Sequence, residues 1–197
     1  MSPVNASALI FDCDGTLTDS MPLHFLCWHQ TMQRHGITFD EDRFYSLGGI
    51  PTDKIIAMLS QEQGVPVNVP EAAQQKEAAF IDMLHQLEPI PFVVEVARQQ
   101  RGRLKMAVAS GGFRSIIEQQ LRQIGVHDWF DTIVSAEDTA LHKPEPDVFL
   151  EAARRLGVPP ELCLVYEDSD LGIEAARRAG MTWVDVRDHH RPRRITS

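Results

Sequence analysis

The sequence predicts an α/β protein whose core is a doubly wound parallel sheet, interrupted after its first strand by an α-helical insertion. Three observations carry this prediction. Five apolar runs rich in β-branched residues recur along the chain, helical patterns alternate with the later runs, and the stretch 19–86 has helical periodicity with no convincing strand. Strand–helix–strand alternation is typical of parallel sheets with right-handed crossovers and helices on both faces.

The predicted strands are nearly continuous apolar runs, a pattern typical of parallel strands that are buried on both faces. Their β-branched content separates them from helical segments of the same length. The sequence therefore predicts five parallel strands: ALIFD (8–12), LKMAVAS (104–110), DTIVSA (131–136), LCLVYED (162–168) and TWVDV (182–186).

Helices are predicted between the later strands because their patterns end at glycines, which favour the left-handed conformation that closes a helix. The segment that begins at Pro146 places proline in the first helical turn, where its missing N–H costs nothing. The predicted helices are FRSIIEQQLRQIG, ending at Gly125, PDVFLEAARRLG, ending at Gly157, and LGIEAARRAG, ending at Gly180.

The stretch from about 19 to 86 contains three segments of helical periodicity: FLCWHQTMQRHG, TDKIIAMLSQEQG and PEAAQQKEAAFIDMLHQL. It lies between the first and second predicted strands. We therefore expect two domains, a core formed by 1–18 and 87–197 and a helical cap formed by 19–86.

Composition excludes several function classes. The 197-residue chain carries a formal net charge of −9, which disfavours binding to nucleic acid or to anionic membrane surfaces. No apolar run approaches the length that spans a bilayer. The first residues have no basic segment of the kind that opens a secretion signal. The basic end RPRRITS (191–197) is short and is expected to be a solvated tail.

The three cysteines, Cys13, Cys27 and Cys163, have no motif spacing and are odd in number. We expect reduced thiols in a cytoplasmic protein. Cys13 lies between two aspartates, and we expect it to be a small core residue and not a catalytic thiol.

The stretch LIFDCDGTLTDS (9–20) places two carboxylates at the end of the first predicted strand. Residues two apart in a strand point to the same side, so Asp12 and Asp14 start together at the edge where open α/β sheets bind ligands. Gly15 allows a sharp turn that brings backbone N–H groups near a ligand. Two unpaired carboxylates repel each other, and a divalent cation such as Mg²⁺ would relieve that repulsion.

More acidic residues follow the fourth predicted strand, in VYEDSD (165–170). Glu167 and Asp168 lie at a carboxyl end that meets the same edge of the sheet. An isolated aspartate at a strand-to-helix turn is usually an N-cap, and we expect that role for Asp170. Capping does not explain acids at two strand ends, so the sequence favours a cation site there.

A lysine and an anion-binding turn complete the pattern. Lys143, in HKPEPD, follows the third strand; a lone lysine is usually exposed, but near an acidic edge it suits phosphate or aspartate. Ser110, Gly111 and Gly112 end the second strand, where a hydroxyl and free N–H groups form either an anion site or an ordinary turn. Together these parts suit phosphoryl transfer through an aspartyl-phosphate.

These motifs resemble the haloacid dehalogenase superfamily, in its β-phosphoglucomutase-like branch, which has a helical cap and includes small sugar-phosphate phosphatases. The resemblance covers nearly the whole chain. It rests on the pattern DxDGTLxDS at 12–20, followed in order by Ser110, KPEPD (143–147) and EDSDLGIEAARRAG (167–180). It implies a Rossmann-like core with an inserted α-helical cap.

The resemblance also implies roles. Asp12 would be the nucleophile that takes the phosphoryl group, and Asp14 the general acid and base that protonates the leaving sugar oxygen and then activates water. Mg²⁺ would be held by the Asp12 carboxylate, the Asp14 carbonyl and Asp168, with Glu167 acting through water.

Further roles follow for the loops and the cap. Ser110, Gly111 and Lys143 match the positions that bind phosphoryl oxygens in the family. His24 and Lys76 match positions of the cap that face the substrate, although single histidines and lysines on helices are more often solvated.

The sequence departs from the mutases at two places. In LGGIPTDKI (47–55), Thr52 stands where the mutase carries an arginine that grips a second phosphate. After Ser110, Gly112 and Phe113 replace polar and basic side chains. Both changes weaken the case for a sugar bisphosphate intermediate and so favour a phosphatase over a mutase. The cap pattern more closely resembles phosphatases that act on fructose 1-phosphate or 6-phosphogluconate, and this resemblance implies an Mg²⁺-dependent phosphatase of that type.

Two alternatives remain at this stage. One is a sugar phosphomutase with the same chemistry. The other is a non-enzymatic module that accepts phosphate on Asp12 as a signal, which the adjacent Asp14 and the helical insertion disfavour. We expect no nucleic-acid or membrane partner, and a monomer is favoured.

Overall fold

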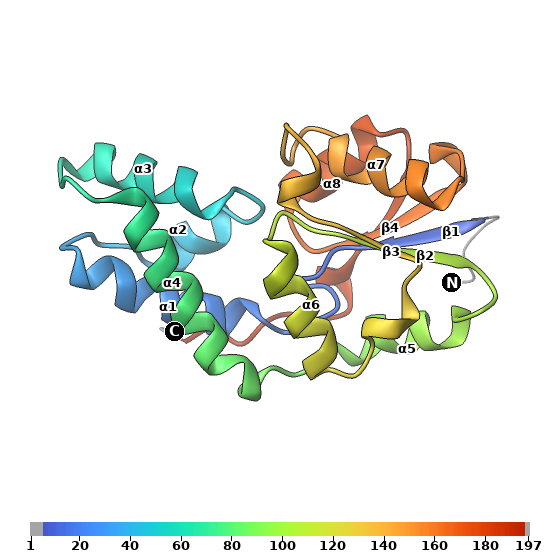
Figure 1. Cartoon of the computed structure of the whole chain (residues 1–197), viewed down its shortest axis with the longest axis horizontal. Helices are drawn as coiled ribbons and strands as arrows, with labels where there is room; N and C mark the ends of the chain where they lie inside the picture. Colours follow the sequence, from blue (N-terminus) through green and yellow to red (C-terminus); the bar gives the residue numbers. More distant parts are fainter. Residues whose placement is uncertain (1–5, 196–197) are drawn as a thin grey trace.

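The computed structural model describes residues 6–195 and contains one five-stranded parallel sheet in the order β3-β2-β1-β4-β5 (Figure 1). Every predicted strand is confirmed, and the parallel α/β fold with it. The strands are β1 (Ala8–Phe11), β2 (Lys105–Ala109), β3 (Thr132–Val134), β4 (Cys163–Glu167) and β5 (Thr182–Asp185).

The order of the strands reverses at β1, which pairs with β2 on one side and with β4 on the other. Ile10 therefore lies opposite both Ala107 and Val165 in the central register. In open parallel sheets, ligands bind outside the carboxyl ends of the strands at such a reversal. The fold thus places the end of β1, with Asp12 and Asp14, at the centre of the expected binding edge.

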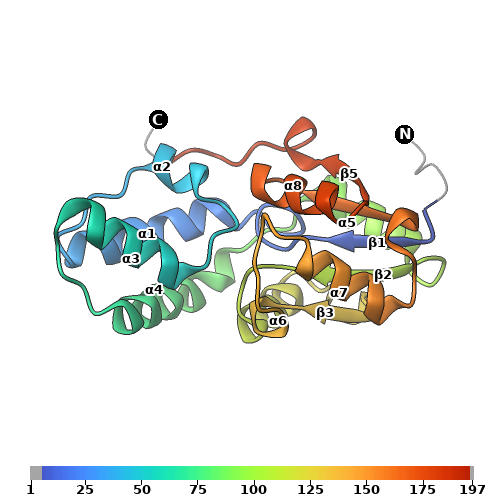
Figure 2. The same ribbon diagram turned by 90° about the horizontal axis from the view of Figure 1, so that it is seen from above.

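Helices cover both faces of the sheet (Figures 1 and 2). Alternate strand residues point to opposite faces, so Ile10 packs toward α7 and α8 while Phe11 packs toward α5 and α6. All four helices bury apolar side chains in these two layers. Their bounds are α5 (Pro91–Gln100), α6 (Arg114–Gln123), α7 (Asp147–Leu156) and α8 (Asp170–Arg178).

The three helices predicted between the later strands are confirmed, with two corrections at their starts. Pro146 is the N-cap of α7 and not its first helical residue. Asp170 is not the cap of α8: Ser169 has the extended backbone of a cap, and its hydroxyl accepts a hydrogen bond from the Gly172 N–H at 3.0 Å. Asp170 instead forms an ion pair with Arg187.

Residues 19–86, called the cap segment below, contain four helices and, among the described residues, no strand of the sheet. They surround a separate apolar cluster with Phe25, Trp28, Phe44 and Ile56 at its centre. The helices are α1 (Met21–Arg34), α2 (Glu41–Ser46), α3 (Thr52–Gln63) and α4 (Val69–Met83). The short α2 has no counterpart among the predicted helices, although Asp40 caps it by accepting the Arg43 N–H at 2.8 Å.

The two connections between the cap segment and the sheet lie side by side. The Asp19 N–H donates to the Glu88 carbonyl at 2.9 Å, and Thr18 forms an isolated β-bridge with Pro89. The chain therefore leaves and re-enters the α/β core at one place. The domain division at 18/19 and 86/87 stays a prediction.

Single 3₁₀ turns complete the fold: η1 (Leu84–Gln86), η2 (His127–Trp129), η3 (Ala136–Asp138), η4 (Pro160–Leu162) and η5 (Val186–Asp188).

The basic C-terminal end is not a free solvated tail, which corrects the expectation for 191–195. It leaves η5 and runs to α2 in the cap segment (Figure 2). The Arg194 guanidinium forms an ion pair with Asp42 and lies over the Tyr45 ring at 4.2 Å, and the Ile195 N–H donates to Glu41 at 2.8 Å. The part of the tail at 196–197, like residues 1–5, lies outside the described residues.

Two further expectations concern the cysteines and membrane-spanning helices. Cys13, Cys27 and Cys163 are free thiols and are buried, and Cys13 packs in the apolar layer under α5 and α6, as expected for a small core residue. No helix within 6–195 is both long enough and apolar enough to cross a membrane.

Candidate active site

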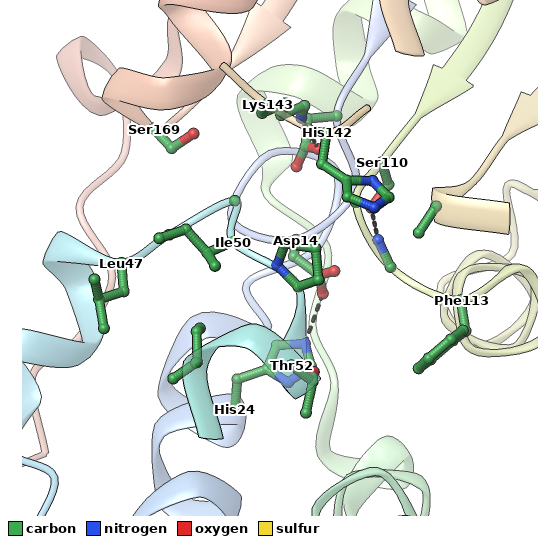
Figure 3. Close-up of a pocket in the computed structure, with 18 of the residues that line it drawn as sticks. Asp14, His24, Leu47, Ile50, Thr52, Ser110, Phe113, His142, Lys143 and Ser169 are labelled. Carbon is green, nitrogen blue, oxygen red and sulfur yellow. Dashed lines mark hydrogen bonds and ion pairs between the residues drawn. The ribbon is translucent and has the colours of Figure 1, made fainter. Parts of the chain in front are cut away.

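A cavity of about 340 Å³ opens between the carboxyl ends of the strands and the cap segment (Figure 3). All of the side chains and loop residues that the sequence singled out line it, from both parts of the chain. From the α/β core these are Asp12, Asp14, Ser110, Gly111, Lys143, Glu167 and Asp168, and from the cap segment His24, Thr52 and Lys76.

Glycines allow the acidic groups of β1 and β4 to come close together. Gly15 has φ of +79°, and a Cβ there would lie 2.1 Å from Asp168 Oδ2. A Cβ on Gly172 would lie 2.0 Å from the Glu167 carboxyl carbon. Any larger residue at either position would displace a carboxylate, so both glycines are required by close approach.

Lys143 connects the acids of the two strand ends. Its ammonium donates to Asp12 Oδ1 at 2.6 Å and to Glu167 Oε2 at 2.7 Å, and all three side chains are buried. Charge-assisted bonds of this length are strong, and removing Lys143 would leave two buried carboxylates without their cation. Burial lowers the pKa of Lys143, but the two carboxylates outweigh it and hold the pKa above its ordinary value.

The three carboxylates of this cluster cannot all ionise readily beside a single ammonium group. Burial raises the pKa of Asp12 well above its ordinary value, and the nearby Glu167 and Asp168 add to the rise, which Lys143 opposes. Burial also raises the pKa of Asp168 to about 8, reinforced by Glu167. One ammonium group therefore does not neutralise three carboxylates, and the cluster favours an additional cation.

The donor set fits Mg²⁺. Asp12, Glu167 and Asp168 each offer a carboxylate oxygen, and these oxygens lie within 4.8 Å of one another. Hard oxygen ligands from a few carboxylates are what Mg²⁺ takes in proteins, with water completing its shell. The Asp14 carboxylate is not part of this set.

Asp14 faces the other way, toward the cap segment. Its Oδ1 accepts hydrogen bonds from the Ser20 hydroxyl at 2.7 Å, from His24 Nε2 at 2.8 Å and from the Gln120 amide at 2.9 Å. Figure 3 marks the contact with His24. Burial alone would raise the pKa of Asp14, but His24 and the other donors outweigh it and lower the pKa below its ordinary range.

His24 is held in one tautomer by its neighbours. Its Nδ1 accepts from the Lys76 ammonium at 3.0 Å, so its proton lies on Nε2 and is donated to Asp14. The ring also stacks on Phe80, with centroids 3.7 Å apart. Burial and the positive charge of Lys76 lower the pKa of His24, which favours the neutral ring.

The contacts continue from Lys76 into the wall of the cavity. The Lys76 ammonium donates to Glu77 Oε1 at 3.2 Å and Oε2 at 3.3 Å, and the Thr52 hydroxyl donates to Glu77 Oε1 at 2.9 Å. The predicted cap residues Thr52, Lys76 and His24 thus form one connected chain of polar contacts that ends at Asp14.

The loop after β2 meets the cap segment directly. Ser110 is buried, and its hydroxyl accepts the Gly112 N–H at 3.1 Å. A Cβ on Gly111 would lie 3.5 Å from the Gly49 carbonyl oxygen, and a Cβ on Gly49, whose φ is +90°, would lie 3.8 Å from the Lys143 Cβ. The cap segment is therefore closed against the loops that carry Ser110 and Lys143.

Sequence reasoning missed three residues of the site: Ser20, Gln120 and Glu77. Gln120 carried a readable signal, because it lies on the apolar face of α6 with Ile116, Ile117 and Leu121 and is fully buried. A polar residue on such a face needs a buried partner. Ser20 lay in the motif itself, whereas Glu77 is one of many acidic residues on helices and gave no such signal.

Comparison with known proteins identifies relatives over most of the chain. The family model of haloacid dehalogenase-like hydrolases matches residues 9–186. The fructose-1-phosphate phosphatase YqaB of Escherichia coli is 39% identical over 182 residues, covering 92% of this chain and 96% of that protein. The β-phosphoglucomutase of Bacillus subtilis is 31% identical, covering 91% of this chain and 82% of that protein.

Solved structures agree with the fold. The crystal structure of β-phosphoglucomutase from Clostridium difficile superposes with a TM-score of 0.83 at 25% identity, covering 91% of this chain and 84% of that one. The parallel sheet and the helical insertion are thus shared with that branch. The extent of the family match and the identity to the Escherichia coli phosphatase together show that this chain belongs to the haloacid dehalogenase-like hydrolase family.

Proposed function

We propose that this protein is a phosphatase that hydrolyses small sugar monophosphates through an aspartyl-phosphate on Asp12. The observation that carries the proposal is one cavity that is lined by the following groups together: Asp12, Asp14, Lys143, Glu167 and Asp168. The 39% identity to a fructose-1-phosphate phosphatase supports the same reaction and suggests fructose 1-phosphate as a substrate.

In the first step, an Asp12 oxygen attacks phosphorus while the bond from phosphorus to the sugar oxygen breaks. Lys143 orients Asp12, and Ser110 and the adjacent N–H groups bind phosphoryl oxygens. Asp12, Glu167 and Asp168 would hold Mg²⁺, with the Asp14 carbonyl as a predicted fourth ligand. Bound Mg²⁺ would neutralise charge on the phosphoryl group and so let a carboxylate approach it.

Asp14 moves the protons in both steps. The dianionic phosphate raises its pKa when the substrate binds, so Asp14 takes up a proton and delivers it to the leaving sugar oxygen. Ionised again, it removes a proton from the water that attacks phosphorus, and inorganic phosphate leaves Asp12. The cap segment, with its hinge at the paired connections near Thr18 and Pro89, would open to release the products.

The cap residues favour hydrolysis over the mutase reaction. A mutase must hold a sugar bisphosphate by its second phosphate, and Thr52 offers only a hydroxyl that is already bound to Glu77. The nearby Lys76 is bound to Glu77 and His24.

The test is release of inorganic phosphate from fructose 1-phosphate, 6-phosphogluconate and β-glucose 1-phosphate, with and without Mg²⁺. The proposal expects Mg²⁺-dependent release from at least one of these sugars, with fructose 1-phosphate the first candidate, and expects the release to be lost in Asp12→Asn. Conversion of β-glucose 1-phosphate to glucose 6-phosphate in the presence of a bisphosphate primer, without phosphate release, would instead identify a mutase.

A further inference from the structure

The charged side chains differ between the phosphoryl end of the cavity and the side that the cap segment forms. At the phosphoryl end, Lys143 is bound to Asp12 and Glu167. The side that the cap segment forms contains the carboxylates of Asp53 of α3 and Glu77 of α4. Lys76 and Lys143 are the two ammonium groups among the described residues that line the cavity.

Lys76 has no donor left for a substrate anion. An ammonium group has three N–H donors. In Lys76 one meets His24 Nδ1 at 3.0 Å and two meet the Glu77 oxygens at 3.2 and 3.3 Å. The Lys76 side chain is only 4% exposed, so water supplies little further solvation. Lys76 lines the cavity, but Glu77 neutralises it.

Glu77 is itself fixed in this position. The Thr52 hydroxyl donates to its Oε1 at 2.9 Å, and its side chain is only 16% exposed. A second anionic group on the substrate would therefore meet a carboxylate held in place, while both ammonium groups of the described cavity lining are already paired with carboxylates. Like charges placed together at a partly buried site disfavour binding strongly.

We propose that Glu77 is a specificity-determining residue that excludes substrates with a second anionic group at the end distant from the transferred phosphoryl. The inference rests on the proposed phosphatase function and refines its substrate class to sugar monophosphates whose distal end carries only hydroxyl groups. Fructose 1-phosphate fits this class. Fructose 1,6-bisphosphate and 6-phosphogluconate, whose distal ends carry a phosphate and a carboxylate, do not.

The test compares kcat/KM for fructose 1-phosphate and for the 1-phosphate of fructose 1,6-bisphosphate, two substrates that differ only at C6. The wild-type protein should favour the monophosphate by at least about tenfold. Glu77→Gln keeps the shape but frees the charge of Lys76, so the preference should fall by about tenfold. Thr52→Val removes only the hydrogen bond from Thr52 to Glu77, so it should reduce the preference for the monophosphate by a smaller factor.

The matched control is Glu71→Gln, the same chemical change on the same helix. Glu71 is exposed and lies outside the cavity lining, whereas Glu77 contacts Lys76, so Glu71→Gln should leave the substrate preference within about twofold of wild type. A thermal unfolding scan of each variant checks that it is folded. Binding of both sugars to Asp12→Asn, with and without Glu77→Gln, by calorimetry repeats the comparison without turnover.

An unchanged preference in Glu77→Gln, with Mg²⁺-dependent phosphate release intact, would overturn the inference and leave the phosphatase proposal standing. Equal use of both sugars by the wild-type protein would do the same. Absence of hydrolysis, together with absence of binding of either sugar to Asp12→Asn, would overturn both.

Discussion

Asp12 and Asp14 are two residues apart, yet their side chains lie in different environments. Asp12 is matched by a charge, the Lys143 ammonium at 2.6 Å, in a cluster built entirely by strand ends and loops of the α/β core. Asp14 instead accepts hydrogen bonds from uncharged groups. Ser20 and His24 of the cap segment donate two of them, and Gln120 of the core donates the third.

The difference separates what each carboxylate can do. The Asp12 contacts lie within the core, so opening of the cap segment would leave them in place. Two of the three donors to Asp14 come from the cap segment, so opening of the cap segment would move them away from Asp14. Closure would therefore set the basicity of Asp14 as well as exclude water.

The largest effect is expected for Asp12→Asn. An amide is a poor nucleophile toward phosphorus, so kcat should fall by about 10⁴-fold or more. The thermal midpoint should stay equal or rise, because the change removes a buried negative charge near Glu167 and Asp168. Phosphate release and calorimetry measure the two effects, and substantial remaining activity would assign the nucleophile elsewhere.

His24→Ala tests whether the pKa of Asp14 depends on contacts with the cap segment. Removing this donor should raise the pKa of Asp14, because His24 is the leading contributor that lowers it. In a plot of kcat against pH, the acidic limb should therefore move to higher pH. The maximum kcat should fall by about 10- to 100-fold. His29→Ala, on the exposed side of the same helix, is the control and should leave the profile in place. An acid limb that does not move in His24→Ala would refute the link.

Removal of Mg²⁺ tests the carboxylate cluster of Asp12, Glu167 and Asp168 as a metal site. Burial raises the pKa of Asp168 to about 8, so the folded metal-free protein binds this proton more tightly than the unfolded chain does. The stability contributed by the protonated group is fully present below about pH 4 and is lost as the pH rises through about 8. Mg²⁺ binds the ionised form.

Mg²⁺ should therefore raise the thermal midpoint more near pH 8.5 than near pH 6. The measurement is thermal unfolding with and without Mg²⁺ at matched ionic strength, and Asp168→Asn should lose most of the difference. Equal stabilisation by Mg²⁺ at both pH values would contradict the assignment of this cluster as the metal site.

The smallest effect is expected at the C-terminal contact with the cap segment. Arg194→Ala removes an ion pair with Asp42 and a cation–π contact with Tyr45, and both lie near the surface. The free energy of unfolding should fall by at most about 1 kcal/mol. Arg193→Ala, an exposed neighbour, serves as control, and a loss as large in that variant would show that the contact is not specific.

The sequence predicted the parts of the molecule that depend on local patterns. The strands follow from apolar runs, and Asp12, Asp14 and Lys143 were found because they end strands or follow them. The contacts that tune Asp14 could not be found in this way. Gln120 is 106 residues from Asp14 in the chain, and only the packing of α6 against the end of β1 brings them together.

The cap segment shows the same limit. His24, Thr52 and Lys76 were predicted from a family pattern, but their connection through Glu77 depends on how α1, α3 and α4 pack. The docking of the C-terminal end on α2 likewise joins residues 152 apart, Arg194 and Asp42. Composition alone predicted a solvated tail, because a basic segment does not reveal the acidic helix that it meets.

The most direct test of the roles of the two aspartates is to trap the phosphorylated chain. The Asp14→Asn variant is mixed with Mg²⁺ and p-nitrophenyl phosphate, whose leaving group needs no proton from Asp14, quenched in acid, and examined by mass spectrometry of the intact chain and of its peptides. We expect a phosphoryl group on Asp12 that persists because no base activates water. Fast turnover without any phosphorylated chain, or a phosphoryl group on another residue, would contradict the account.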